Sequence, residues 1–448
     1  MTKQNILYIH THDSGKVFSS YGYDVPTFNI DKFATDAITF DNAFCASPTC
    51  SPSRSSLLTG NYPHTNGMLG LANRGFELND YHEHLVNILN ENGYDTVLCG
   101  IQHEYGKYTE HQEGAQKIGY RYDITKDCSS LKEKDFWKWD TENTKSFEKW
   151  ISSRNKNKPF FASVGYFCTH REYPDVLEEF SNFKLPKELE NNESVIKDYK
   201  GHLQSLKYLD NNFGKIIECL KMENLYENTI IILTTDHGIA FPKCKCTLYD
   251  AGIGVALMMK IPDKNKGIRV KSLVSHVDIV PTLVELCQLD TKLKFDGKDF
   301  SGLFKNDAED NTIVAEVNCH TSYEPMRCIR TNRYKYIRYY DEEYKLENLS
   351  NIDNSISKEN YILCSKGFEK EMEQFYDLIN DPNEKINLIN NDKYQDVINE
   401  MRLKLINWQK ETNDYLLRGK LKFKTNWIVN KPTCLDPKSK SEYDFIKI

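Results

Sequence analysis

Short runs of apolar and β-branched residues alternate with helical patterns along this chain, and no other feature of the sequence limits its fold so strongly. Such an alternation predicts an α/β architecture, in which a mainly parallel sheet is sandwiched by helices. The apolar residues of the longer expected helix recur every three or four positions and therefore fall on one face. The expected strands lie at residues 5–10, 95–99, 159–167 and 229–235, and the expected helices at 81–92 and 202–222.

The pattern changes near residue 307, which predicts two structural units. Residues 1–307 form the expected α/β catalytic domain, and residues 308–448 form a smaller α+β subdomain. A polar stretch over residues 342–370 is predicted to be a long surface insertion. The subdomain is expected to contain short strands at 312–316, 327–331 and 334–339 and a helix at 393–412.

The charge balance and the cysteine content narrow the functional classes. The chain has 58 Lys and Arg against 65 Asp and Glu, a net charge of −7, which argues against a general nucleic-acid-binding protein. No apolar run approaches the length of a membrane span. Thirteen cysteines without disulfide-like spacing, together with a start that lacks signal-peptide features, predict a cytoplasmic location.

The ends of the four expected strands carry the first functional signal. The carboxyl ends of parallel strands gather at one edge of a sheet, where α/β proteins place their working groups. A single His or Asp at such a position is usually a turn former or a helix cap. Four such strand ends together favour a functional site, and the His/Asp pairs at two of them predict a shared divalent cation, with carboxylate oxygens as the main ligands and imidazole as the secondary ones. The residues concerned are His12 and Asp13, His103, Thr169 and His170, and Asp236 and His237.

A serine-rich stretch around Cys50 gives the second signal. Pro52 suits the first turn of a helix and Gly60 suits its end, so Cys50 is expected at a helix N-terminus. Unpaired N–H groups at that position favour an anion, and Arg54, one turn further, is expected to bind two of its oxygens. This predicts a phosphate or sulfate site. The interval between Cys50 and Arg54 is shorter than in a phosphatase cysteine loop, which disfavours a thiolate phosphatase.

The chain resembles the sulfatase family of the alkaline-phosphatase-like superfamily. The family signature matches residues 50–54 (CSPSR) and 58–60 (LTG). The resemblance extends over nearly the whole chain, and within the family the chain looks most like the heparan N-sulfatases, or N-sulfoglucosamine sulfohydrolases. Further matching runs are 235–238 (TDHG), 245–249 (KCTLY), 278–283 (DIVPTL) and 376–382 (YDLINDP).

The resemblance implies a fold, a chemistry and partners. It implies an alkaline-phosphatase-like α/β fold and a sulfatase that hydrolyses a sulfate ester or sulfamate on a sugar. Glycosaminoglycan-derived saccharides such as N-sulfoglucosamine are the candidate substrates. It also implies that a formylglycine-generating maturation enzyme converts Cys50 to formylglycine. One hydroxyl of the hydrated aldehyde attacks sulfur, a histidine protonates the leaving group, and the second hydroxyl expels sulfate. Nothing in the sequence indicates an oligomeric state.

Two sets of residues take their roles from this resemblance. The first set holds a divalent cation, which is calcium in most sulfatases, and the second set makes the catalytic and substrate contacts. The implied metal set is His12, Asp13, Cys50, Asp236 and His237. The implied catalytic set is Cys50 itself, Arg54 bracing it, His103 helping to expel sulfate, and His170 and Lys245 contacting the sulfate and the leaving group.

Two departures from the family pattern leave alternatives open. Most sulfatases carry two consecutive acids after the first strand, where this chain has His12 and Asp13. Manganese, magnesium and zinc are therefore candidate metals as well as calcium. His12 is either a metal ligand itself or a residue that contacts a metal ligand. The familiar Gly-Lys-x-His reads GIQH at residues 100–103, and Lys107 or Lys243 is the candidate replacement for the missing lysine.

Two other functions compete with the sulfatase interpretation. A phosphomonoester, phosphodiester or phosphonate hydrolase of the same superfamily would also use Asp and His metal ligands. A non-catalytic protein that binds a sugar or an anion is suggested by the missing lysine at position 101 and by His12. Candidate sugar contacts are Arg74, Tyr105, Arg171 and Tyr173.

Overall fold

The central strand of the large sheet is β1 (Asn5–Thr11), whose seven residues are all buried. In this computed structural model, which describes residues 3–181, 183–264, 266–305, 311–365 and 367–446, β1 pairs in parallel with a strand on each side. Across the described residues, the nine strands of the sheet lie in the order β4 (Tyr122–Asp123), β3 (Asp95–Gly100), β5 (Phe160–Gly165), β1, β6 (Thr229–Thr235), β8 (Leu257–Lys260), β2 (Ile38–Phe44) and β7 (Gly254–Val255), with β9 (Arg269–Ser275) also paired to β2.

The sheet is mainly parallel, as the sequence predicts. The strands from β4 to β6 are parallel neighbours, whereas β8 introduces antiparallel pairs at the opposite edge. Each of the four predicted strands is present with ends within two residues of the expected positions. Strands buried on both faces have continuous apolar sequences, which is why these four could be identified.

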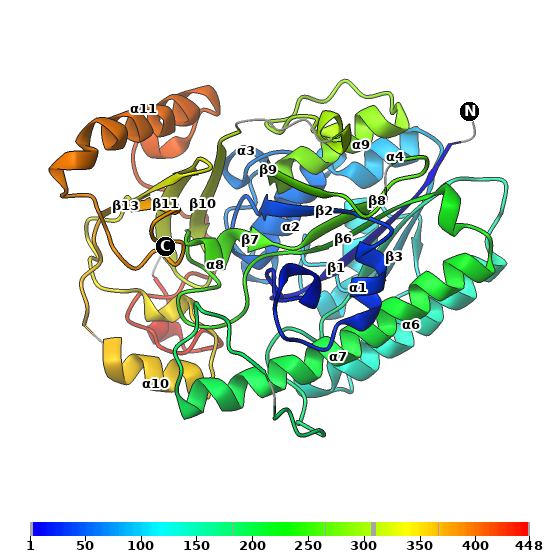
Figure 1. The fold of residues 1–448 in the computed structure, drawn as a ribbon, viewed down its shortest axis with the longest axis horizontal. Helices are drawn as coiled ribbons and strands as arrows, with labels where there is room; N and C mark the ends of the chain where they lie inside the picture. The colour runs from blue at the N-terminus through cyan, green and yellow to red at the C-terminus, as the bar shows by residue number, and fades with distance from the viewer. Residues whose placement is uncertain (1–2, 182, 265, 306–310, 366, 447–448) are drawn as a thin grey trace.

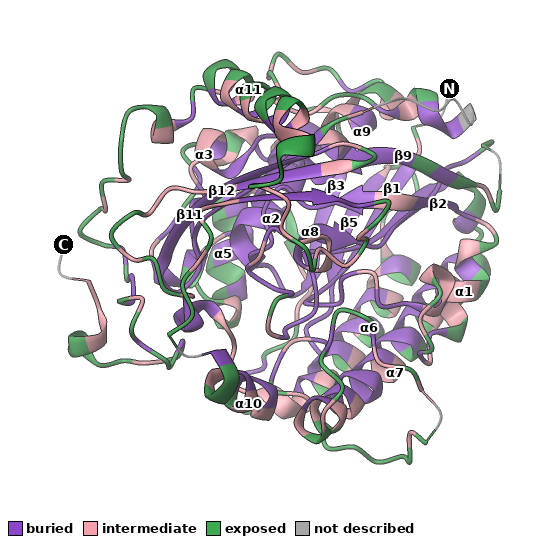
Figure 2. Ribbon diagram, turned by 60° about the vertical axis from the view of Figure 1, so that its left-hand side comes forward, coloured by how far each residue is buried: buried purple, intermediate pink, exposed green. Residues whose placement is uncertain are grey.

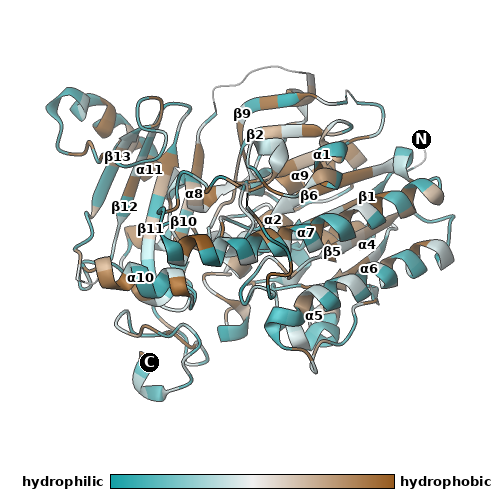
Figure 3. Cartoon of the chain, turned by 60° about the horizontal axis from the view of Figure 1, so that its bottom comes forward, coloured by the Kyte–Doolittle hydropathy of each residue, from teal (hydrophilic) through white to brown (hydrophobic). Residues whose placement is uncertain are grey.

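Helices cover both faces of the sheet and enclose two separate apolar clusters (Figure 1). The face that carries Ile6 and Tyr8 of β1 packs against α2 (Cys50–Thr59), α4 (Leu85–Glu91) and α9 (Ile279–Cys287). The face that carries Leu7 and Ile9 packs against α1 (Phe28–Ala34), α6 (Phe136–Ser153) and α7 (Glu193–Met222). Hydrophilic and hydrophobic bands alternate along α7 (Figure 3). None of the described helices is long and apolar enough to cross a membrane.

Two helices differ from the sequence predictions at their N-terminal ends. Helix α7 begins at Glu193 rather than at residue 202, because the Asn192 side chain accepts a hydrogen bond from the backbone N–H of Val195 and caps an additional polar stretch. The expected helix at 81–92 is divided, since His84 is extended and caps α4. Short helices elsewhere are α3 (Pro63–Asn66), α5 (His111–Ile118) and α8 (Asp250–Ile253).

A second, antiparallel sheet lies at the end of the molecule opposite the N-terminus (Figure 1). Its strands follow each other in chain order, and α11 (Gln395–Glu411) packs on it through Ile398, Met401 and Leu405. This confirms a smaller α+β C-terminal part, while the predicted boundary at 307/308 lies outside the described residues. The strands are β10 (Ile313–Cys319), β11 (Tyr323–Arg330), β12 (Tyr334–Tyr339) and β13 (Glu373–Asp377).

The prediction that residues 342–370 form a surface insertion is wrong for the middle of this stretch. Leu349, Asn351 and Lys358 are buried, and α10 (Ile356–Ser365) packs against α7. The polar composition reflects buried hydrogen bonds and ion pairs rather than exposure to solvent. Figure 2 shows exposed residues on the outer sides of α10 and α11, whereas the strands of the large sheet are almost wholly buried.

Candidate active site

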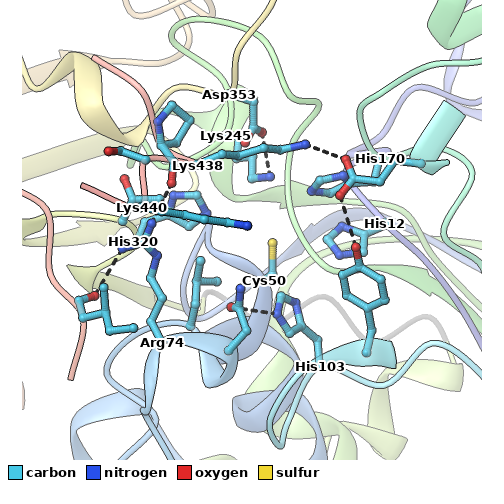
Figure 4. A pocket seen from close by; sticks show the side chains of 18 of the residues that line it. His12, Cys50, Arg74, His103, His170, Lys245, His320, Asp353, Lys438 and Lys440 are labelled. Carbon is cyan, nitrogen blue, oxygen red and sulfur yellow. Dashed lines mark hydrogen bonds and ion pairs between the residues drawn. The ribbon is translucent and has the colours of Figure 1, made fainter. Parts of the chain in front are cut away.

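Side chains that follow β1, β3, β5 and β6 meet at one edge of the large sheet, beside the N-terminus of α2. Because β5, β1 and β6 are adjacent and parallel, the residues at their carboxyl ends emerge together. A cavity of about 560 Å³ opens at this edge. Five residues predicted for the site line it: His12, Cys50, His103, His170 and Lys245 (Figure 4).

A buried cluster of carboxylates, imidazoles and one thiol lies beside this cavity. One possible ligand atom from each residue lies within 4.8 Å of every other one. His12 Nδ1 is 2.8 Å from Asp13 Oδ1 and 3.1 Å from Asp236 Oδ2. His237 Nε2 is 3.4 Å from Asp13 Oδ1 and 3.5 Å from Cys50 Sγ. These five residues are the metal set that the resemblance implies.

Hydrogen bonds around the cluster fix its orientation. The Nδ1–H of His237 donates to the carbonyl oxygen of Gly238 at 3.0 Å, which leaves Nε2 with a lone pair on the side of Cys50. Gly238 is required because a Cβ there would lie 2.0 Å from the carbonyl oxygen of Ala251. The Asp13 N–H donates to Asp236 Oδ1 at 2.8 Å and joins the two strand ends. Buried oxygen and nitrogen donors arranged in this way fit a divalent cation.

Two cationic side chains balance the two carboxylates. Lys245 Nζ lies 2.9 Å from Asp13 Oδ2, and Arg54 Nη2 lies 3.0 Å from Asp236 Oδ2. Burial alone would raise the pKa of Asp13, but Lys245 and neighbouring histidines hold it well below its usual value. The pKa of Asp236 is likewise lowered, against the effect of burial, by nearby histidines and Arg54. Both groups are therefore ionised at neutral pH.

Arg54 is oriented differently from the anion fork that the sequence predicts. Its Nη2 donates to Asp236 and, at 3.2 Å, to the carbonyl oxygen of Thr11, while Nη1 contacts His10. The guanidinium is buried, and its Nε has no hydrogen-bond partner among the described residues. Arg54 thus supports a carboxylate and the end of β1. Its bracing of a modified Cys50 stays a prediction.

Cys50 begins α2, at the position expected from the sequence. All ten residues of this helix are buried, and its last residue, Thr59, is followed by Gly60, whose φ of +71° lies in the left-handed region that favours glycine. Burial raises the pKa of the Cys50 thiol well above its usual value, and Lys245 opposes this only in part. An unmodified Cys50 is therefore a neutral thiol and a poor nucleophile.

Two further histidines face the cavity. His103 Nε2 lies 3.3 Å from Asn73 Oδ1, so Nε2 carries the proton and the buried Nδ1, which has no partner among the described residues, carries the lone pair. Burial, with a smaller contribution from Arg54, lowers the pKa of His103 to about 3. The Nδ1–H of His170 donates to the carbonyl oxygen of Arg171, and its Nε2 lies 3.8 Å from Asp13 Oδ2.

The sequence analysis missed the residues that the C-terminal part contributes. Asp353 Oδ2 lies 2.8 Å from Lys245 Nζ, so this ammonium group is held between two carboxylates. The two residues are 108 positions apart, and no local pattern connects them. His320, in the turn after β10, is buried and lines the cavity. Lys438 and Lys440, close to the C-terminus, also line it.

Several other predicted contacts are not at the cavity. Of the described residues proposed to bind a sugar, Arg74 lines the cavity but Tyr105, Arg171 and Tyr173 do not. Arg171 is buried in an ion pair with Asp198 instead. Lys107 and Lys243, the candidates to replace the missing lysine at position 101, are also absent from the described lining.

Comparison with family models covers most of the chain. A model described as sulfatase matches residues 4–289. A second model, described as N-sulphoglucosamine sulphohydrolase, C-terminal, matches residues 240–355. The first range contains the buried cluster, and the second contains both His320 and Asp353.

Comparison with known proteins also finds sulfatases. The chain is 28% identical to an ulvan-active sulfatase of Formosa agariphila, over 92% of this chain and 81% of that protein. It is 22% identical to the N-sulphoglucosamine sulphohydrolase of Homo sapiens, over 92% of this chain and 91% of that protein. A solved structure of a protein in complex with its substrate, D-glucosamine-2-N,6-O-disulfate, is 18% identical, with a TM-score of 0.69 and coverage of 92% of this chain and 98% of that chain. At this identity the likeness concerns the fold.

Proposed function

Since this chain belongs to the sulfatase family, whose members hydrolyse sulfuric esters, we propose that it removes sulfate from a saccharide at the cavity beside Cys50. The position of Cys50 carries the proposal. It is the first residue of α2, it lines the cavity, and its Sγ lies 3.5 Å from His237 Nε2 in the buried cluster. The proposal therefore locates the substrate and the reacting residue at the same place in the fold.

Cys50 is the proposed site of formylglycine, formed by a maturation enzyme. The hydrated aldehyde supplies one hydroxyl for attack on sulfur and a second through which sulfate is expelled. Two observations support this assignment. Residues 50–54 match the family signature, and the unmodified thiol is held neutral by burial. A neutral thiol would not perform the displacement on its own.

The buried cluster is the proposed metal site. Asp13, Asp236 and His237 are the proposed ligands, and the position of His12 Nδ1 between both carboxylates supports His12 as a fourth. A divalent cation supplies charge stabilisation for oxygens of the reacting group. Calcium is the first candidate because of the family. Two imidazoles make the set softer than an all-oxygen site, so manganese, magnesium and zinc are included in the test.

The remaining cavity residues bind the substrate and move protons. Lys245 is charged, because Asp13 and Asp353 raise its pKa against the effect of burial, and it is proposed to bind sulfate oxygens. His103 is neutral and offers the lone pair of Nδ1 to accept a proton as sulfate is expelled. His170 lines the cavity, and with both ring nitrogens protonated its Nε2–H is the proposed proton donor to the leaving oxygen or nitrogen.

The proposed substrate is a glycosaminoglycan-derived sugar, with N-sulfoglucosamine as the first candidate. The match of the C-terminal family model and the similarity to the human sulphohydrolase support this choice. The cavity of about 560 Å³ is within the range of small-molecule sites. We also propose a cytoplasmic location, supported by thirteen free cysteines, which would restrict the substrate to small imported saccharides. Cell fractionation tests the location.

The proposal is tested on protein produced together with a formylglycine-generating enzyme. The Cys50 peptide is expected to be about 18 Da lighter than the unmodified peptide. Sulfate release is then measured from N-sulfoglucosamine, from O-sulfated glucosamine and from ulvan saccharides, with the phosphate ester of the same sugar for comparison. Cys50→Ala should abolish release, whereas Cys364→Ala, at an exposed cysteine, should not. Failure of the matured protein to release sulfate, or a preference for the phosphate ester, refutes the proposal.

A further inference from the structure

The C-terminal segment, defined here as residues 427–446, runs beside the cavity and is held there by Arg74. This arginine is only 8% exposed. It donates to the carbonyl oxygen of Ile428 at 3.2 Å, to Asn430 Oδ1 at 2.9 Å and to the carbonyl oxygen of Pro437 at 2.6 Å. Its hydrogen-bonding capacity is therefore directed to the segment rather than to a sugar, although it lines the cavity.

A second group of contacts holds the segment from the side of α10. The buried Lys358 donates through Nζ to the carbonyl oxygen of Leu435 at 2.6 Å. Asn354 Nδ2 donates to Asp436 Oδ1 at 2.8 Å. The residues immediately before Lys438 are thus fixed by polar contacts on two sides, so their position is part of the fold.

Beyond these anchors, Lys438 and Lys440 enter the cavity from the side of Arg74 and His320 (Figure 4). Lys438 Nζ lies 3.9 Å from Glu172 Oε1 and 2.5 Å from Glu133 Oε2. Both side chains of this pair are partly exposed, and such pairs contribute little to stability, so an anionic ligand can compete for the lysine. Lys440 has no ion pair or hydrogen bond to any residue that the structure describes.

Lys440 has no acidic partner among the described residues that line the cavity. Glu133 and Asp353 are the acidic residues of the described lining. Glu133 is engaged by Lys438 and, at 3.1 Å, by the hydroxyl of Tyr108, and Asp353 is engaged by Lys245. The cavity is therefore locally basic in a chain whose net charge is −7. A pocket of this sign draws in anions.

We propose that Lys438 and Lys440 form a second anion site, which binds a negatively charged group of the saccharide other than the sulfate that is cleaved. This inference rests on the proposed function and makes it narrower, because the preferred substrate then carries at least two anionic groups. The second group is a sulfate or a carboxylate, since both accept charge-assisted hydrogen bonds from ammonium groups.

The test compares kcat/KM of the matured enzyme on three saccharides. They are N-sulfoglucosamine, its 2-N,6-O-disulfated form, and N-sulfoglucosamine linked to a uronic acid. The wild-type enzyme is expected to prefer one of the two doubly charged compounds, and which one identifies the second group. Lys440→Gln should reduce kcat/KM for that compound about tenfold more than for N-sulfoglucosamine, the usual effect of losing a charge-assisted hydrogen bond.

Lys438→Gln should lower the same preference by a smaller factor, because Glu133 already engages this lysine. Lys422→Gln is the matched control, since Lys422 is exposed and outside the described cavity lining, and it should keep the wild-type preference. Higher ionic strength should weaken the preference in the wild type more than in Lys440→Gln. The inference is overturned if the wild type does not prefer a doubly charged sugar, or if Lys440→Gln lowers all three values equally. Absence of sulfate release from every compound would instead contradict the proposed function.

Discussion

Asp414, which follows α11, forms a buried ion pair with Arg327 near the end of β10, the strand that precedes the cavity residue His320. Its carboxylate accepts hydrogen bonds from Arg327 Nε at 2.8 Å and from Arg327 Nη2 at 2.9 Å. Arg327 also donates to the carbonyl oxygen of Val317 and to Asn318 Oδ1, both at 3.0 Å. These contacts hold the end of β10 just before His320. The pH dependence of unfolding should therefore show the contribution of this pair.

The size of the effect follows from the pKa of Asp414. Burial alone would raise it, but Arg327 lowers it from 3.8 to about 2. A carboxyl group with a lowered pKa stabilises the fold above its unfolded-state value, and this stabilisation disappears as the pH falls through the folded-state value. This lowering of the pKa corresponds to about 2 kcal/mol. Nearly half of this contribution, about 1 kcal/mol, is lost between pH 6 and pH 3.

Urea denaturation of the wild type and Asp414→Asn at several pH values between 6 and 3 measures how much the ion pair contributes to the free energy of unfolding at each pH. The free energy of unfolding should be lower for the variant at pH 6, and the gap should narrow by about 1 kcal/mol at pH 3. Asp392→Asn, at an exposed aspartate near the start of α11, should follow the wild type throughout. A gap that stays constant over this range would show that Arg327 does not hold Asp414 ionised, and the reasoning would be refuted.

Three further predictions concern the site itself. Dialysis against a chelator should lower the Tm measured by calorimetry, since an ion present at a hundred times its Kd and bound only to the folded state adds about 2.7 kcal/mol; an unchanged Tm on adding back each candidate metal would contradict the metal site. Asp353→Asn should lower kcat/KM by about tenfold or more, because Lys245 loses one of the two carboxylates that orient it, and wild-type kinetics would argue against this orienting role. His103→Gln should reduce kcat by about a hundredfold or more with a smaller change in KM, as expected when a group that exchanges a proton is lost, and a change in KM alone would assign His103 to substrate binding.

The large sheet and the core of the site could be predicted because local and global signals agree there. Each buried strand has a continuous apolar sequence, and the rule that parallel strands end at one edge brings His12, Asp13, Asp236 and His237 together from distant positions. The helix that starts at Cys50 was also evident, because Pro52 and the terminal Gly60 mark its two ends.

The rest of the site depends on contacts that no local pattern contains. Asp353 lies in a polar stretch whose composition resembles an exposed loop, although its partner Lys245 is buried. The predicted direction of the Arg54 side chain was wrong for a related reason. The helix position indicates which face Arg54 is on, but acceptors from β1 and the loop after β6 decide where its guanidinium points. Lys438 and Lys440 could not be predicted as cavity residues for the same reason, because a contact with the distant Arg74 holds their segment at the site.

Lys245 connects the chemistry of the site with the recognition of its substrate. Its Nζ lies between Asp13, beside the buried cluster, and Asp353, which belongs to the same stretch of chain as Lys358. Because Lys358 also holds the C-terminal segment, a change at Lys358 would disturb both the segment and the carboxylate that orients Lys245. Substitution of Lys358 should therefore change kcat and KM together. Lys438→Gln and Lys440→Gln leave the contacts that Arg74 and Lys358 make with the C-terminal segment in place. These two substitutions therefore test substrate recognition separately from catalysis.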